Sequence, residues 1–441
     1  MSNGRIPQLV ITMALLVALG PAGAAAADKP ADKSKPETKR VEAVGHWAFS
    51  RLNRAHEALS EERYEDATRE LDDMKRGLER LNPHERAMMW QTYGYVQASQ
   101  GEHEQAVASF EKCLAENGLP ENVHTSTIRN VAQIYLMLND YEKAIEKFEQ
   151  LIARTEIPTS QTHYMLALAY AQSGNVKEAL AHAELAVEKT DQPDEGRLQL
   201  LAALYFREER FEDLLPLLEQ LVTHFPKKSY WIQLSAIYVE VGRPKEALGV
   251  QEAAYEQDLL TEHREYLTLA RLFLQNDVPY EAAQVIEGGI ERGVVEPVAD
   301  AWELLGSAYL QAREYEKAVG PLERAAEVSQ GGEVYLRLGE VYLNRYRWAD
   351  ARRALASAIR KGGVEDVGLA HLLLGIANAG ESRYEAAKTS LTIAGAYDKH
   401  AEVARQWIEH VERERQFLAA QSQTVSADAH AGDTGVDAGA L

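Results

Sequence analysis

The sequence predicts an all-α fold, a solenoid built from helix pairs that repeat along the chain. Between Ala87 and Ala394 one pattern recurs nine times: a bulky residue, a small residue directly after it and, in most units, a Tyr-like residue three positions on and an Ala twelve positions on. A helical pattern with a period of about 34 residues is typical of stacked helix hairpins. The small residues, spaced 33 to 38 positions apart, are Gly94, Ala132, Ala167, Ala202, Ser235, Ala270, Gly306, Gly339 and Gly375.

Each repeat is predicted to be two helices that cross closely. In the unit that begins at Asp300, one helical face carries Trp302, Leu305 and Tyr309, with Gly306 beside Leu305. The second helix carries a further apolar stripe, made by Ala318, Leu322 and Ala325. Close approach requires small residues where the helices meet, so Gly306→Leu and Ala318→Leu are each expected to destabilise the fold by about 1 to 3 kcal/mol.

Turn residues separate the helices at regular places. Short polar stretches interrupt the apolar rhythm at Asn139-Asp140, Ser173-Gly174-Asn175 and Val241-Gly242-Arg243-Pro244. Prolines end several second helices, at Pro158, Pro193, Pro226 and Pro297. Three glycine pairs near the same junctions predict helix ends in a left-handed conformation, at Gly288-Gly289, Gly331-Gly332 and Gly362-Gly363.

These residues resemble the tetratricopeptide repeat (TPR) family, whose signature is Trp or Tyr, then Leu-Gly, Tyr, Ala, Phe and Pro. The matching residues of the first two units are Trp90, Gly94, Ala106 and Phe110, then Ala132, Tyr135, Ala144 and Phe148. Leu214 and Asn378 depart from the signature in the fourth and ninth units. A degenerate unit precedes the nine, with Ala55, Tyr64, Ala67 and Leu71 at the same spacing. The resemblance covers Val44 to Leu418 and implies a right-handed superhelical solenoid with a concave groove.

Four segments are expected from one end of the chain to the other. Residues 1–27 have Arg5, an apolar run from Leu9 to Leu19 and then small residues, as in a cleavable secretory signal peptide, so a periplasmic location is predicted. An uncleaved anchor is the alternative. Residues 28–44 are predicted to be a flexible charged linker, residues 45–418 the solenoid, and residues 419–441 a disordered tail.

A capping helix is predicted to close the solenoid before residue 418. Its apolar stripe, made by Val403, Trp407, Ile408 and Val411, would cover the last repeat, because an uncovered repeat exposes apolar surface to water. The alternative is a helix that docks a partner. The mature protein is not expected to insert stably in a membrane.

Composition argues against several classes of function. The formal net charge is −21, and a protein that binds nucleic acid needs a basic face, so a nucleic-acid partner is not expected. Cys113 is the single cysteine, and it occupies a slot that Ala fills in other units, so it is predicted to be a small buried residue. Adjacent carboxylates such as Glu61-Glu62 and Asp72-Asp73 are interpreted as solvated surface.

No motif for chemistry emerges from the sequence. The thirteen histidines are scattered, and neither a ligand-like spacing, a phosphate loop nor a nucleophile elbow is present. The chain is therefore predicted not to be an enzyme, with no catalytic residue, no metal site and no cofactor. A catalytic site between repeats remains the alternative from another class.

A protein or peptide partner is expected in the concave groove, because the first helix of each unit lines that side in this architecture. Polar and aromatic side chains there can hydrogen-bond an extended peptide and stack on it. The candidate groove residues are Gln91, Tyr95, Arg129, Gln133, Tyr164, Gln199, Arg271, Glu303 and Glu340. Ordinary helix surface is the alternative for each of them.

A narrower resemblance concerns three segments. Residues 229–238, 252–256 and 278–283 are similar to the exported TPR proteins associated with TonB energy-transduction systems of Gram-negative bacteria. This resemblance implies a periplasmic accessory role beside TonB, ExbB and ExbD components in outer-membrane nutrient uptake. The alternative is a periplasmic assembly scaffold for polysaccharide or protein export.

Overall fold

The computed structural model describes residues 42–431, and the side chains of residues 42–421. Within that part the regular structure consists of α-helices and one short 3-10 helix, with no strand, so the predicted all-α fold class is confirmed. The predicted signal peptide, residues 1–27, and nearly all of the predicted linker, residues 28–44, lie outside the described residues.

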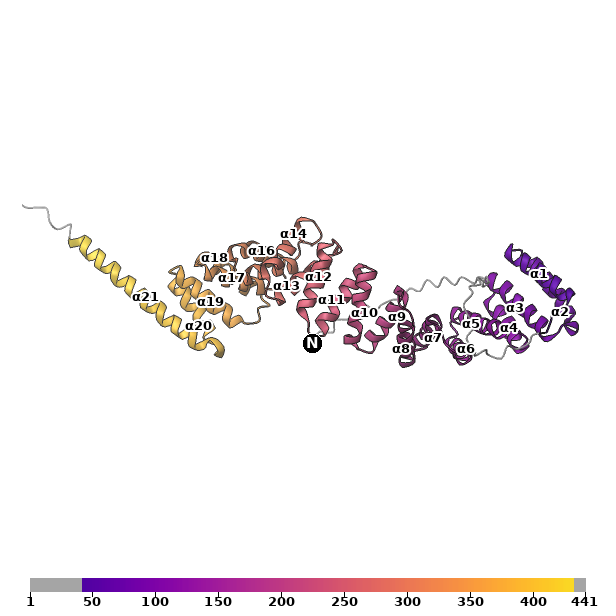
Figure 1. Cartoon of the computed structure of the whole chain (residues 1–441). Helices are drawn as coiled ribbons and strands as arrows, with labels where there is room; N and C mark the ends of the chain where they lie inside the picture. Colours follow the sequence, from indigo (N-terminus) through magenta and orange to yellow (C-terminus); the bar gives the residue numbers. More distant parts are fainter. Residues whose placement is uncertain (1–41, 432–441) are drawn as a thin grey trace, which may run out of the picture. The chain divides into compact units, whose positions relative to one another are not determined.

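Ten successive helix pairs, each joined by a short turn, precede one long final helix (Figure 1). The first pair is the degenerate unit, where Ala55, Ala67 and Leu71 are buried. In chain order the helices are α1 (His46–Ser60), α2 (Tyr64–Arg76), η1 (Leu78–Arg80), α3 (Pro83–Ser99), α4 (His103–Ala115), α5 (Glu121–Met137), α6 (Tyr141–Arg154), α7 (Ser160–Ser173), α8 (Val176–Glu188), α9 (Glu195–Arg207), α10 (Phe211–His224), α11 (Lys228–Glu240), α12 (Pro244–Glu256), α13 (His263–Gln275), α14 (Pro279–Glu291), α15 (Ala299–Gln311), α16 (Tyr315–Val328), α17 (Glu333–Asn344), α18 (Trp348–Lys361), α19 (Val367–Gly380), α20 (Tyr384–Ala394) and α21 (Asp398–Ala431).

The chain divides into two compact units, with the boundary between Arg210 and Phe211. Unit 1 contains α1 to α9, and unit 2 contains α10 to α21. The sequence predicted one uninterrupted solenoid. The boundary falls in the repeat where Leu214 replaces the Ala of the other units.

Within a hairpin, the two helices touch at the small residues of the repeat. A Cβ atom added at Gly306 would lie 2.6 Å from the Leu322 side chain, and one at Gly94 would lie 2.6 Å from Phe110. Gly339 and Gly375 meet a leucine of the second helix at 2.5 Å in the same way. Where serine fills this slot, the Ser235 hydroxyl donates a hydrogen bond to the backbone carbonyl of Ala247 across the crossing, at 3.0 Å. The sequence therefore placed the helix crossings correctly.

The turns inside the hairpins share one backbone conformation. Each contains one residue with positive φ, which reverses the chain after the first helix. The sequence identified three of these residues correctly. The full set is Glu62, Gly101, Asn139, Gly174, Glu209, Gly242, Asp277, Arg313, Tyr346 and Ser382.

The three glycine pairs do not share one role. Gly362 and Gly363 have positive φ and end a helix, as predicted. The prediction is wrong for Gly288-Gly289, which lies inside α14. A Cβ at Gly289 would lie 2.5 Å from Val295 and 2.7 Å from Tyr266, so this glycine makes room for neighbouring side chains. Gly332 likewise admits the backbone of Ala358, since a Cβ there would lie 2.2 Å from that carbonyl oxygen.

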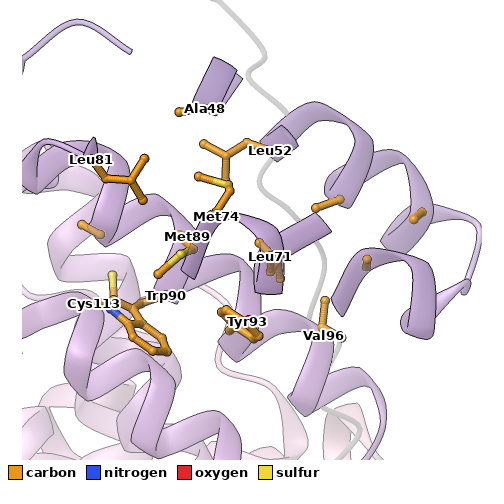
Figure 2. Packing of buried hydrophobic residues seen from close by; sticks show 14 of the residues in the cluster. Ala48, Leu52, Leu71, Met74, Leu81, Met89, Trp90, Tyr93, Val96 and Cys113 are labelled. Carbon is orange, nitrogen blue, oxygen red and sulfur yellow. The ribbon is translucent and has the colours of Figure 1, made fainter. Parts of the chain in front are cut away.

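The core at the start of unit 1 is continuous from α1 to α4. Figure 2 shows Leu71, Met74, Met89 and Trp90 packed together, with Cys113 at the same cluster. Cys113 is fully buried, as predicted from its Ala-like position. Burial, together with the charge of Glu116, raises the pKa of the Cys113 thiol to about 12. The thiol therefore stays protonated and acts as a packing residue.

Helix α21 covers the last repeat of unit 2. Trp407, Ile408 and Val411 pack in one apolar cluster with α19 and α20, as the predicted stripe requires. Val403 does not belong to it, being 43% exposed. The prediction of a disordered tail from residue 419 is wrong for residues 419–431, which continue α21. That stretch is rich in alanine and contains neither glycine nor proline, so helix continues to be favoured. Residues 432–441 lie outside the described residues.

Candidate functional site

The first helices of neighbouring repeats approach each other more closely than the second helices do. Cα atoms lie within 8 Å between α1 and α3, α7 and α9, α13 and α15, and α17 and α19. Among the described helices, no pair of second helices from neighbouring repeats makes a comparable approach. Each unit is thus narrower on the side of its first helices, and that side is called its inner wall. The predicted groove residues all lie on first helices.

On the inner wall of unit 1, neutral polar groups connect α3 to α5. The Gln91 side-chain amide donates a hydrogen bond to the Thr127 hydroxyl at 2.8 Å, and the Asn130 amide donates to the Tyr95 hydroxyl at 3.2 Å. The Tyr95 ring also meets Phe110 edge to face. Burial raises the pKa of Tyr95, although the hydrogen bond from Asn130 opposes that shift. Gln91 and Tyr95 therefore hold neighbouring repeats together as well as lining the wall.

An arginine connects α7 and α9 on the wall of unit 1. The Arg197 guanidinium lies 5.2 Å from the centre of the Tyr164 ring and donates hydrogen bonds to Ser160 and Gln161. Burial raises the pKa of Tyr164, and the charge of Arg197 opposes that shift. The Gln199 amide donates to Glu195 within α9 at 3.3 Å. The cation therefore sits beside an aromatic ring on this part of the wall.

The inner wall of unit 2 is charged where α15 meets α17. The Arg337 guanidinium donates to a Glu303 carboxylate oxygen at 3.0 Å and to the Ser307 hydroxyl at 3.2 Å. Burial raises the pKa of Glu340, and the neighbouring Glu333 adds to the shift while Arg337 opposes it. Glu303 and Glu340 thus belong to one cluster centred on a single arginine.

The nine predicted residues do not form a single site. They lie on the walls of two separate units, and four of them, Gln91, Tyr95, Tyr164 and Glu303, are engaged with the first helix of the next repeat. Arg129 on α5 and Arg271 on α13 are exposed, whereas Gln133 and Glu340 are partly buried. Of the nine predicted residues, the two exposed arginines are the most accessible to a partner.

Sequence reasoning missed a repeated hydrogen bond between neighbouring repeats. In five of the described repeats, the tyrosine three positions after the small residue donates its hydroxyl to a glutamate on the second helix of the preceding repeat. Tyr205 reaches Glu184 at 2.9 Å and Tyr309 reaches Glu287 at 2.7 Å. Other pairs are Tyr170 with Glu149, Tyr238 with Glu219 and Tyr342 with Glu323, and Tyr93 makes a similar bond to Asp72.

Burial is the main cause of a raised pKa in five of these tyrosines, and the accepting carboxylate adds to it; they are Tyr93, Tyr170, Tyr238, Tyr309 and Tyr342. The pKa of Tyr170 and that of Tyr238 rise to about 12. Some of the rings also lie under a cation from the following turn, as Tyr205 does under Arg210 at 4.5 Å. The tyrosines are therefore neutral donors that join repeats. The signal in the sequence is an acidic residue 19 to 22 positions before each tyrosine.

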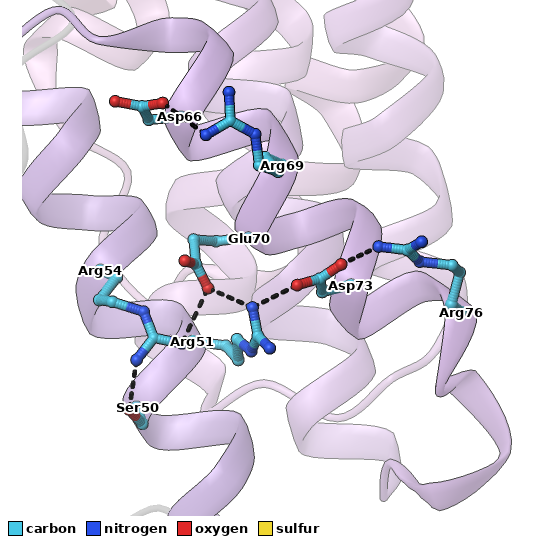
Figure 3. A network of polar contacts seen from close by, with 8 residues as sticks. All are labelled: Ser50, Arg51, Arg54, Asp66, Arg69, Glu70, Asp73 and Arg76. Carbon is cyan, nitrogen blue, oxygen red and sulfur yellow. Dashed lines mark hydrogen bonds and ion pairs between the residues drawn. The ribbon is translucent and has the colours of Figure 1, made fainter.

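Carboxylates read as solvated surface also take part in structure. Asp73 accepts hydrogen bonds from Arg51 and Arg76, and Arg51 also binds Glu70 at 2.7 Å, which joins α1 to α2 (Figure 3). Arg54 donates to Glu70 as well, and its hydrogen bond is the main cause of a lowered pKa at Glu70. The interpretation as plain solvated surface is therefore wrong for Asp73, and for Asp72, which accepts from Tyr93.

Neither a metal cluster nor a membrane-crossing helix is found among the described residues. No group of three or more His, Cys, Asp or Glu side chains there is arranged to hold a metal ion. Of the helices described, none combines the length and the apolar character that crossing a membrane requires.

Comparisons with known proteins concern the repeats themselves. Residues 132–194, 267–333 and 336–392 match the tetratricopeptide repeat family, and residues 87–117 match a second family of the same description. No curated protein has a significantly similar sequence.

Solved structures with some likeness to the chain are repeat proteins of low identity. A tetratricopeptide repeat protein from Parabacteroides merdae ATCC 43184 is 17% identical, with a TM-score of 0.37, over 68% of this chain and 100% of its own. The C-terminal part of a TPR repeat-containing protein from Cytophaga hutchinsonii is 17% identical, with a TM-score of 0.36, over 63% and 98%. MamA from Desulfovibrio magneticus RS-1 is 16% identical, with a TM-score of 0.31, over 37% and 90%. The assignment of the repeats rests on the sequence matches, not on these likenesses.

Proposed function

Since four segments of this chain are tetratricopeptide repeats, we propose that the protein is a non-enzymatic periplasmic scaffold that binds a protein partner on its inner walls. The observation that carries this proposal is the presence of exposed, chemically varied side chains on the first helices. Arg129 and Arg271 are exposed on first helices, and Gln133 and Tyr164, also on first helices, are partly buried. Arginine and tyrosine are enriched among the residues that dominate the energy of protein interfaces.

The partner proposed is a component of a TonB–ExbB–ExbD energy-transduction system for outer-membrane nutrient uptake. The support is the resemblance of residues 229–238, 252–256 and 278–283 to exported repeat proteins that accompany such systems. The first two of these segments belong to α11 and α12 of unit 2. The chain's charge of −21 favours a partner with basic or polar segments.

The test is binding of the purified full-length chain to the periplasmic domains of TonB and of ExbD, measured separately by titration calorimetry. We expect saturable binding of at least one domain. Binding of neither, together with recovery of polysaccharide-export or protein-export components by cross-linking in the envelope, would replace the proposal by the assembly-scaffold alternative.

Charge-reversal variants locate the binding surface. Arg129→Glu in unit 1 and Arg271→Glu in unit 2 remove exposed cations from first helices, and loss of binding is expected from at least one of them. The matched controls are Lys177→Glu on α8 and Lys245→Glu on α12, which are exposed cations on second helices. If the controls weaken binding as much as the wall variants do, the partner does not use the inner walls.

The location has its own test. The chain is expressed with and without residues 1–27, and periplasmic and cytoplasmic fractions are compared. We expect the full chain to reach the periplasm and to be cut near Ala27, and the chain without residues 1–27 to stay in the cytoplasm. A full chain that stays uncut in the membrane fraction would support the uncleaved anchor.

A further inference from the structure

A pair of histidines is enclosed in one hairpin of unit 1. His163 on α7 and His182 on α8 place their Nδ1 atoms 3.1 Å apart, and their rings are nearly parallel with centres 5.3 Å apart. His163 is only 5% exposed. The Tyr170 ring is also parallel to that of His182, with ring centres 5.7 Å apart. The sequence signalled nothing here, because the two residues are 19 positions apart and on different helices.

The short contact between the two Nδ1 atoms constrains the protons of the pair. A neutral imidazole carries one N–H, so the contact holds only when one ring donates through Nδ1 and the other accepts through Nδ1. A first added proton enters at Nε2 of the donor ring and places a charge in a buried site. A second proton enters at Nδ1 of the acceptor, which turns two N–H groups toward each other and sets like charges in contact.

Charged residues on the neighbouring helices partly compensate a positive charge added to the histidine pair. Glu149 on α6 accepts a hydrogen bond from the Tyr170 hydroxyl, and its charge acts on His182 to oppose the lowering of that pKa. On α8, Glu178 acts on Tyr170, while Lys189 after the end of α8 adds a positive charge that acts on His163. From α9, the Arg197 guanidinium is bound to Ser160 at the start of α7. Charges of both signs thus act on the pair, and burial is the largest influence on each histidine.

We infer that the contact between His163 and His182 makes the α7–α8 hairpin a pH-sensitive element, closed near neutral pH and opening locally when the solution becomes acidic. The α7–α8 hairpin has two states, closed and open. The closed state excludes the second proton from the histidine pair, and the open state accepts it. Mass action then moves the population toward the open state as the proton concentration rises.

The sign of the effect follows from the direction of the pKa shifts. Burial lowers the pKa of both His163 and His182 below the ordinary value of 6.5. The charge of His182 adds to the lowering at His163. Between the lowered values and 6.5 the open state binds more protons than the closed state. The stability of the hairpin is therefore complete above pH 6.5 and is lost as the pH falls below it.

The opening would reach the inner wall of unit 1. Tyr164 follows His163 directly on α7, and its ring is the one that Arg197 covers. An α7 that separates from α8 therefore carries part of the wall with it. The local opening itself does not depend on any partner, so its test is independent of the proposed function.

Hydrogen exchange read by mass spectrometry on the full-length chain tests the inference at pH 7.5 and pH 5.0, after correction for intrinsic exchange rates. We expect amide protection in α7 and α8 to fall by about tenfold or more at pH 5.0, the loss that one shifted proton can produce. The reference is the α15–α16 hairpin, which contains no histidine. Equal changes in both hairpins would overturn the inference.

Variants assign the effect to the pair. His163→Gln and His182→Gln each remove one proton site, and the pH dependence of α7–α8 protection is expected to shrink in both. His371→Gln, at a single partly buried histidine on α19 of unit 2, should leave it unchanged. If the two glutamine variants fail to fold, a titration of wild-type protein labelled with nitrogen-15 histidine decides. Protonation of both His163 and His182 at or above pH 6.5 would overturn the inference.

Discussion

The two units of this protein share a scaffold and differ in the chemistry of their inner walls. In unit 1 the first helices are joined by neutral hydrogen bonds and by an arginine over an aromatic ring, as at Gln91–Thr127 and Arg197–Tyr164. In unit 2 the corresponding connection is an ion pair, Arg337–Glu303, with Glu340 beside it. The hairpin crossings themselves are formed by the small residues and the apolar side chains opposite them, such as Gly306 and Leu322, so polar wall residues can change while the crossing is kept.

This difference indicates two kinds of surface for a partner. A neutral wall with amides and aromatic rings suits the backbone of an extended segment, because each amide can donate and accept. A wall with paired charges suits a partner that brings charges of its own, and its contribution depends on salt. The shared scaffold and the divergent walls give separate predictions, and the scaffold carries the larger effects.

The largest effect is expected at the helix crossings, which should be equally sensitive in both units. Gly94→Ala and Gly306→Ala each add a methyl group 2.6 Å from the side chain of the crossing helix, Phe110 and Leu322 respectively. Overpacking of this kind costs about 1 to 3 kcal/mol. Chemical denaturation followed by circular dichroism measures the loss of free energy of unfolding.

The control for that prediction is Gly320→Ala, in α16 of the same hairpin as Gly306. A Cβ at Gly320 meets nothing within 4 Å, so alanine there should stabilise the helix by about 0.5 to 1 kcal/mol. Opposite signs for Gly306→Ala and Gly320→Ala would confirm the crossing. Equal signs would mean that helix propensity, and not the crossing, governs both positions.

The crossings were predictable from sequence because they are local. Gly306 and Leu322 belong to the same hairpin, and the same spacing recurs in the other units. Gly289 was wrongly predicted to end a helix. The space that a Cβ atom would fill there is occupied by Tyr266, on the first helix of the same repeat, and by Val295, which follows the second helix. A glycine that makes room looks the same in sequence as a glycine that turns the chain.

The connections between repeats were less predictable, for a different reason. The tyrosines of the repeats were recognised as packing residues, yet in five repeats the hydroxyl bonds a glutamate of the preceding repeat, as at Tyr309 and Glu287. In a chain with 68 acidic residues, one glutamate at a distance of 19 to 22 positions does not stand out. To predict a wall contact such as that of Asn130 with Tyr95, one must know the distance between two first helices. The repeat pattern of the sequence does not give that distance.

The next effect in size concerns these tyrosine hydrogen bonds, which both units share. Tyr205→Phe in unit 1 and Tyr309→Phe in unit 2 remove the donor to Glu184 and to Glu287. Each should cost about 1 kcal/mol, near the lower end for a bond to a charged group because the carboxylates are partly solvated. Tyr135→Phe is the control, since a cation and not a bonded carboxylate is the neighbour of that ring, Lys143 at 5.3 Å. If Tyr135→Phe lowers the free energy of unfolding as much as the other two variants do, the hydrogen bond to a carboxylate does not explain their loss of stability.

A pH titration examines the same hydrogen bonds without mutation. The pKa of Tyr170 in unit 1 and that of Tyr238 in unit 2 rise to about 12 from an ordinary value of 10.0. Above pH 10 the unfolded chain releases these protons while the folded chain keeps them, so the free energy of unfolding should fall between pH 10 and pH 12. The absorbance of tyrosinate follows the titration. Tyrosines that all ionise near pH 10 before the helical signal is lost would contradict the prediction.

The smallest effect separates the two walls. Arg337→Gln removes the ion pair with Glu303 in unit 2. Because both side chains are more than a third exposed, the free energy of unfolding should fall by only about 0.2 to 1 kcal/mol. This loss should shrink at high salt. Gln91→Ala removes the neutral hydrogen bond to Thr127 in unit 1, and a similar loss there should not respond to salt, because no charge is involved. Local hydrogen exchange in α17 and in α5, at low and at molar sodium chloride, reports each wall separately. If both losses shrink equally with salt, the walls do not differ in the way that their side chains indicate, and a partner would have no electrostatic reason to prefer one over the other.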